Sequence, residues 1–263
     1  MRRPDSAAVE ALGAETWARL RALTLWHAGL TQAAARALAA TGWRLEALDL
    51  RWNHKLGAAG LAALLAAPTF ALRRLDLVYC GLAAANILAI ANAPWPLKEL
   101  DLSSNDFSAA AAGPALAAIS RHRGLRRLDV GFCALSPASF EALVEAAWPA
   151  MTSLSAADAG VAHDSPHVLG AAAFAGFPAL EELDLSFVRV GEAGAALLAS
   201  RRWARLKKLT LRSTVLGAAG VAALARGAWP ALEVLDLSAN GLGAPMALED
   251  ARRWAPALVE LRA

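Results

Sequence analysis

The sequence predicts an α/β solenoid in which about ten short units stack side by side, with a parallel β-sheet on the concave face and α-helices on the convex face. Three observations lead to this prediction. The pattern LxxLxL recurs along the chain every 25 to 29 residues. Its alternating apolar residues indicate a short strand with one buried face, and the segments that follow space their apolar residues three and four apart, as an amphipathic helix does. A unit this short cannot bury its apolar face alone, so neighbouring units must cover it.

The units follow one another over nearly the whole chain. Their first apolar residues are Leu20, Leu45, Leu72, Leu97, Leu125, Met151, Leu180, Leu206, Leu232 and Leu258. We expect residues 1–19 to form an N-terminal partial repeat with a cap helix, and residues 20–263 to form the repeat domain. The last repeat, LVELRA at 258–263, begins a strand and is truncated, which leaves a sheet edge without a cap. We therefore expect that the chain is a fragment, that the edge pairs with another chain, or that it frays.

The residues between two strands carry helix signals. Segments 57–67 and 136–147 have the helical spacing, and a helix N-cap is expected at Thr31, Ser108 and Ser136, whose side-chain oxygens can accept from an unpaired backbone N–H. Seven of the nine tryptophans stand two to four residues before the next unit begins, so we expect them in the core: Trp17, Trp43, Trp95, Trp148, Trp203, Trp229 and Trp254. Trp26 and Trp52 do not share this position.

Two units carry a longer pattern, LxxLxLxxN, as LKELDLSSN at 97–105 and LEVLDLSAN at 232–240. This pattern resembles the leucine-rich repeat, and the helical half with LGAAG at 56–60 and 216–220 is similar to the ribonuclease-inhibitor-like subclass. The resemblance implies a horseshoe that recognises proteins. It also implies that the ninth place of each unit packs under the turn and bonds to neighbouring backbone. That place holds Asn53, Cys80, Asn105, Cys133, Thr214 and Asn240, with Ala28, Ala159 and Val188 as departures.

Composition excludes several classes of protein. The hydrophobic content of 57% is raised by alanine, and no apolar stretch is long enough to cross a membrane. Asp5, Glu10 and Glu15 interrupt the N-terminal segment where a signal peptide needs an apolar core, so we expect a cytoplasmic protein without membrane contact. Cys80 and Cys133 are too few for a disulfide framework, and their shared place in the repeat predicts a structural role.

No motif of catalysis or cofactor binding is present in the sequence. It has no P-loop, no glycine-rich dinucleotide fingerprint, no nucleophile elbow and no CxxC pair, so we expect no enzyme activity and no cofactor. The stretch HDSPH invites a metal site at His163 and His167. Pro166 favours a helix start between the two histidines, however, and no third ligand is evident, so a loop insertion is the better interpretation.

The concave face holds the candidate site. If side chains alternate along each strand, the third, fifth, seventh and eighth places of every unit point out of the sheet. Those places carry ten acidic and six basic residues, or about −4, so the rest of the chain must carry about +7 to give the formal charge of +3. An acidic wall repels phosphates, and we expect no nucleic acid on this face. Four consecutive fifth places are aspartate, which is common in the family and indicates mainly a scaffold role.

Exposed aromatic residues beside charge are typical of interaction sites. The eighth place carries His27, Trp52, Tyr79 and Phe132, and Trp26 stands beside them; packing on one another along the rim is the alternative. We expect a non-enzymatic protein–protein interaction module whose partner carries basic or apolar groups. The candidate site is Trp26, His27, Asp49, Arg51, Trp52, Asp76, Tyr79, Asp101, Asp129 and Phe132.

Two other functions fit the resemblance. The first is a GTPase-activating regulator resembling the Ran-activating branch of the family, with Arg51 as the residue offered to a bound GTPase, although that branch's acidic tail is absent from this sequence. The second is a substrate-recognition subunit of a larger complex. The residues that precede Trp17 are too few to hold the F-box that such subunits often carry.

Overall fold

The computed structural model describes residue 17 and residues 19–160, 170–243 and 246–263. Most of the expected N-terminal cap segment lies outside the described residues, as do His163 and His167. None of the described helices is long and apolar enough to cross a membrane.

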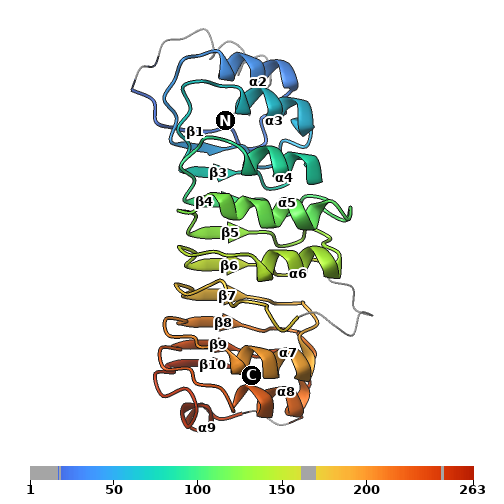
Figure 1. Ribbon diagram of the computed structural model, residues 1–263, viewed down its shortest axis with the longest axis vertical. Coiled ribbons are helices and arrows are strands. Elements are labelled where there is room, and N and C mark those ends of the chain that lie inside the picture. Colours follow the sequence, from blue (N-terminus) through green and yellow to red (C-terminus); the bar gives the residue numbers. More distant parts are fainter. Residues whose placement is uncertain (1–16, 18, 161–169, 244–245) are drawn as a thin grey trace.

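One parallel sheet of ten strands runs through the molecule in chain order, from β1 to β10 (Figure 1). Each strand has three residues, which are the third, fourth and fifth places of the predicted unit, and the central residue is always leucine. The predicted repeats and their register are therefore confirmed. The strands are β1 Ala22–Thr24, β2 Ala47–Asp49, β3 Arg74–Asp76, β4 Glu99–Asp101, β5 Arg127–Asp129, β6 Ser153–Ser155, β7 Glu182–Asp184, β8 Lys208–Thr210, β9 Val234–Asp236 and β10 Glu260–Arg262.

Helices lie along one side of the sheet (Figure 1), and among them α2 to α6 pack on one another in chain order, as α7 packs on α8. Thr31 Oγ1 and Ser136 Oγ accept from backbone N–H groups at the starts of α2 and α6, as expected, but α5 begins after Ala111 without a side-chain cap, so the cap expected at Ser108 is wrong. The helices are α2 Gln32–Ala39, α3 Gly57–Leu65, α4 Ala84–Ala91, α5 Ala112–Ala118, the 3-10 helix η1 Ile119–Arg121, α6 Pro137–Glu145, α7 Gly191–Ser200, α8 Gly217–Leu224 and α9 Leu248–Arg252.

The core lies between the sheet and the helices and is built from the repeated leucines and the corner tryptophans. Five of the seven corner tryptophans are buried, as predicted: Trp43, Trp95, Trp148, Trp203 and Trp229. Two differ: Trp254 is only partly buried against the core, and Trp17 is 41% exposed and stacks on Trp43 with 5.7 Å between ring centroids.

The ninth place of the unit joins neighbouring units through buried polar bonds. Asn105 Oδ1 accepts from the backbone N–H of Cys80 and of Leu82, while its Nδ2 donates to the carbonyls of Leu77 and Leu102. Asn53 and Asn240 bond in the same way. The thiols of Cys80 and Cys133 are buried and free, and each donates to a backbone carbonyl of a preceding unit. The structural role predicted for this place is thus observed.

Candidate functional site

The concave face forms a groove of about 590 Å³ along the sheet. It is lined by the third and fifth places of strands β1 to β8 and the fourth places of β1 to β7, together with Arg51, which follows β2. The leucines at the fourth place form the buried floor, so the chemistry of the groove rests on the third and fifth places. Among the described residues, no group of three or more His, Cys, Asp or Glu side chains is placed to hold a metal ion.

The fifth place forms a ladder of aspartates, which we call the aspartate ladder: Asp49, Asp76, Asp101 and Asp129. Each member is the direct register partner of the next, so the carboxyl groups repeat at the strand spacing of about 4.8 Å. In every one, Oδ1 accepts from the backbone N–H two residues later, at 2.8 to 3.3 Å. Asp184 and Asp236 do the same in later units. The aspartates therefore shape the turn after the strand, which is a scaffold role.

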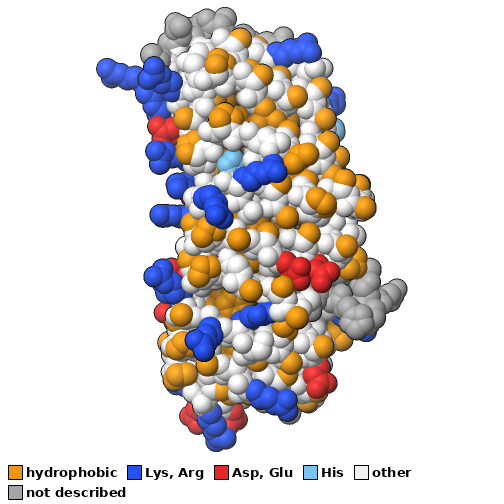
Figure 2. Space-filling model, in the orientation of Figure 1, with side chains coloured by type: hydrophobic (Ala, Val, Ile, Leu, Met, Phe, Trp, Pro, Cys, Tyr) orange, Lys and Arg blue, Asp and Glu red, His pale blue; other side chains and the backbone are white. Residues whose placement is uncertain are grey.

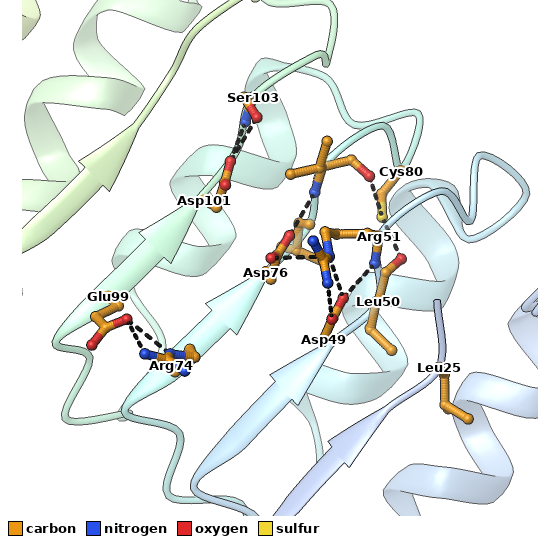
Figure 3. Close-up of polar contacts among 12 residues, drawn as sticks. Leu25, Asp49, Leu50, Arg51, Arg74, Asp76, Cys80, Glu99, Asp101 and Ser103 are labelled. Atoms are coloured by element: carbon orange, nitrogen blue, oxygen red, sulfur yellow. Dashed lines mark hydrogen bonds and ion pairs between the residues drawn. The ribbon is translucent and has the colours of Figure 1, made fainter. Parts of the chain in front are cut away.

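Arg51 compensates the charge at the N-terminal end of the ladder (Figure 3). Its Nε and Nη2 donate to the two carboxylate oxygens of Asp49 at 3.0 and 2.7 Å, and Nε lies 3.3 Å from Asp76 Oδ2. The hydrogen bond with Asp49 raises the pKa of the Arg51 guanidinium. One guanidinium thus serves two carboxylates.

The rest of the ladder has neutral partners. Asp101 accepts from the backbone N–H and the hydroxyl of Ser103, at 2.9 and 2.7 Å.

Burial, followed by the charges of Asp101 and Asp184, raises the pKa of Asp129 to about 6. Burial and the charge of Asp101 likewise raise the pKa of Asp76 to about 6, although Arg51 lowers it. These raised values mean that a positive charge in the groove would stabilise the ionised ladder.

The third place forms a second row of charges beside the ladder. Arg74 donates to Glu99 Oε2 from Nε at 2.8 Å and from Nη2 at 2.6 Å (Figure 3). Arg127 is the register partner of Glu99, but its ion pair lies on the other side. It reaches across β6 to Glu182, at 3.6 Å, and Ser153 Oγ donates to the same carboxylate oxygen.

The aromatic residues lie at the rim, not on the groove floor. His27, Trp52, Tyr79 and Phe132 have positive φ angles between 52° and 62°, because the eighth place belongs to the turn and not to the three-residue strand. All four are described, and none of them lines the groove. The expectation that strand alternation extends to the eighth place is therefore wrong.

This rim is nevertheless exposed. Trp52 is 48% exposed, Tyr79 45% and Phe132 56%, and Trp26 beside them is 51% exposed. Their rings make some contacts with one another: Trp52 and Tyr79 have centroids 5.0 Å apart, and His54 lies 6.2 Å from Tyr79. His54 is not among the residues predicted for the site, so this contact was missed. Its position one residue after the buried Asn53, on the same turn as Trp52, was the available signal.

The groove is acidic, whereas the remaining surface is basic. Lys and Arg side chains are spread over the face shown in Figure 2, from one end of the solenoid to the other, whereas Asp and Glu side chains gather at a few places. The groove carries the aspartate ladder, which agrees with the asymmetry calculated from the sequence. A partner that enters the groove and one that contacts the basic surface would thus carry opposite charges.

The repeat pattern agrees with a known family. The family model described as a leucine-rich repeat matches residues 45–65 and 96–112. The fold is a leucine-rich repeat solenoid. A search of curated proteins finds no match.

Two solved structures are similar to this chain, with TM-scores below 0.5. One is the crystal structure of a TLR13–ssRNA13 complex, with a TM-score of 0.47 and 20% identity, over 97% of this solenoid and 29% of that chain. The other is the crystal structure of the yeast Rad7 and Elc1 complex, with a TM-score of 0.49 and 12% identity, over 98% of this solenoid and 72% of that chain. The solenoid thus spans less than a third of the length of the first chain.

Proposed function

We propose that this leucine-rich repeat solenoid is a non-enzymatic protein-recognition module whose concave groove binds a cationic segment of a protein partner. One observation carries the proposal: four aspartates stand in direct register along the groove, and Arg51 compensates only the first two. Adjacent carboxylates repel one another, so an arginine or lysine side chain from a partner gains attraction from several of them at once. Arginine is favoured, because its planar guanidinium bonds to carboxylates in pairs.

The exposed aromatic row supplies a second contact in this proposal. Trp52 follows Arg51 directly, so the row borders the groove at the carboxyl ends of the strands. Trp52 and Tyr79 are half exposed and restrain each other's rings, and rigid aromatic side chains lose little conformational freedom when they are buried by a partner. The partner is therefore expected to place apolar groups beside its cationic ones.

The two alternative functions compare differently with the site. Arg51 is bonded to two carboxylates, and a guanidinium held in this way is poorly suited to reach the phosphates of a bound GTPase, which weighs against a GTPase activator. A substrate-recognition subunit of a larger complex would use the same groove and is a form of the present proposal. We also propose that the solenoid belongs to the ribonuclease-inhibitor-like subclass, which the helices in most units support. A cytoplasmic location is a second further proposal, and self-association through the outer edge of β10 is a third.

Selection from a displayed library of random peptides tests the groove. We expect peptides that bind the wild-type solenoid to be enriched in arginine or lysine and in apolar residues. The double substitution Asp101→Asn with Asp129→Asn keeps an oxygen to accept the turn hydrogen bond but removes two charges, so the selected peptides should bind it at least about tenfold more weakly. Enrichment of neutral or acidic peptides, or undiminished binding to this variant, would contradict the proposal.

Two further variants separate specific from general effects. Asp236→Asn is a matched control, because Asp236 holds the same place in its unit and accepts from Ser238 N at 2.9 Å but does not line the groove. It should bind the selected peptides as the wild type does. Trp52→Ala with Tyr79→Ala tests the aromatic row: a folded variant that binds with unchanged affinity would remove the row from the site while leaving the aspartate ladder in it.

A further inference from the structure

A second hollow, which we call the basic pocket, lies outside the concave groove. Its volume is about 350 Å³, and it forms where residues 93–98, after α4, meet residues 121–124, at the end of η1 and just after it. Its charged and aromatic lining residues are Trp95, Lys98, Arg121, His122 and Arg123. None of the residues that line it is acidic, so the positive charges meet no carboxylate within the pocket.

The cations of the basic pocket come from two units and are held near one another. A methyl group added at Gly124 would collide with Lys98 Nζ, which places the ammonium group against the neighbouring turn. Arg121 Nη1 donates to the side-chain oxygen of Asn92, a contact that orients its guanidinium beside the pocket. Arg123 is exposed on the same turn. Three positive charges thus surround a hollow of small-molecule size.

The wall of the basic pocket also holds a buried donor without an acceptor. In three other units the corner tryptophan donates from Nε1 to the carbonyl five residues earlier, at 2.8 to 3.0 Å. The equivalent acceptor for Trp95 is the carbonyl of Ile90, which instead faces His122 Nε2 at 2.9 Å. A carbonyl only accepts, so His122 Nε2 carries the hydrogen. Trp95 is 3% exposed, and its Nε1 has no partner.

These features together select the chemistry of a ligand. Uncompensated cations around one hollow repel each other, so a ligand with negative charge and several acceptor oxygens relieves this repulsion. A carboxylate brings one charge and two oxygens. A phosphate monoester brings nearly two charges and three terminal oxygens, which two guanidinium groups and an ammonium group can share. We propose that the basic pocket is a binding site for a phosphate monoester group.

Titration with inorganic phosphate, followed by NMR of the 15N-labelled full chain at constant ionic strength, tests this proposal. We expect saturable shifts of the backbone amides of 93–98 and 121–124 and of the Trp95 indole N–H, which is assigned by its loss in Trp95→Phe. Acetate at the same concentrations should leave them unchanged. Absence of shifts, shifts spread evenly over the chain, or equal shifts with acetate would overturn the proposal.

A matched pair of triple variants tests the residues. Lys98→Ala, Arg121→Ala and Arg123→Ala together should weaken phosphate binding by about a hundredfold or more, because each removes a charge-assisted contact. The control removes three exposed cations elsewhere, with Arg36→Ala, Arg205→Ala and Arg226→Ala. It should bind phosphate within about twofold of the wild type. Equal weakening in both variants would reduce the effect to net charge and refute the site.

Two probes then identify the source of the phosphate group. One is a short peptide that contains phosphoserine, with its unphosphorylated form as a control, and the other is inorganic phosphate. Tighter binding of the phosphopeptide supports a phosphorylated protein as the source, and equal binding supports a small phosphate ester. Equal binding of the unphosphorylated peptide would overturn the proposal. The basic pocket shares no residue with the concave groove, so each site can fail its test without the other.

Discussion

Neutralising one carboxyl group of the aspartate ladder should stabilise the solenoid. The pKa of Asp129 is raised from 3.8 to about 6 by burial and by its acidic neighbours. In the unfolded chain the same carboxyl has its ordinary pKa, near 3.9. The folded state therefore binds this proton more tightly than the unfolded state does. Stability is largest below about pH 4 and is lost as the pH rises through about 6.

The magnitude follows from the difference in pKa. About two pKa units correspond to about 3 kcal/mol in the free energy of unfolding. The amide introduced by Asp129→Asn resembles the protonated carboxyl, since its oxygen can still accept from Gly131 N, where the wild-type distance is 2.8 Å. At about pH 8 we expect the variant to be more stable than the wild type by about 2–3 kcal/mol, whereas near pH 4 the two should agree within about 0.5 kcal/mol.

Denaturant unfolding followed by circular dichroism, at several values from about pH 4 to about pH 8, measures this difference. Subtracting the wild-type curve from the variant curve removes the titration of all other groups. Asp236→Asn, at the same place of a unit outside the groove, controls for the loss of a carboxylate from the turn. A variant that is less stable than the wild type at about pH 8, or a difference that does not change with pH, would refute the reasoning.

Three further predictions concern the scaffold. Replacing Asn105 with alanine leaves three buried backbone groups without partners, because the Leu102 carbonyl keeps the Cys133 thiol, and should cost about 3–5 kcal/mol in urea unfolding; a loss below about 1 kcal/mol would contradict the role of the ninth place. Gly160 has a φ of +85°, and a Cβ there would collide with the backbone of Ala134, so Gly160→Ala should lower the melting temperature clearly; an unchanged value would refute this. Burial raises the pKa of Cys80 and Cys133 to about 12, so both thiols should react with Ellman's reagent only after unfolding, and fast reaction of the native protein would be contrary to this.

Much of the fold could be predicted because each unit repeats the same local signal. Every described strand occupies the third to fifth places of the LxxLxL pattern, and the ninth-place asparagines lie where the family resemblance implies. Alternation over the three strand residues also placed Asp49, Asp76, Asp101 and Asp129 in the groove correctly. The prediction went wrong where the strand ended earlier than assumed, which moved Trp52 and its equivalents from the groove to the rim.

The repeat length, the strand positions, the buried leucines and the acidic character of the groove follow from the sequence alone, because apolar periodicity and charge at fixed places are local properties. The conformation of the turns depends on how the units stack, since Asn53 and Asn105 impose it through bonds to the backbone of adjacent units. This stacking also determines that Arg127 pairs with Glu182 and that His122 takes the acceptor of Trp95. These contacts join residues more than twenty positions apart, and their geometry exists only once the units have stacked.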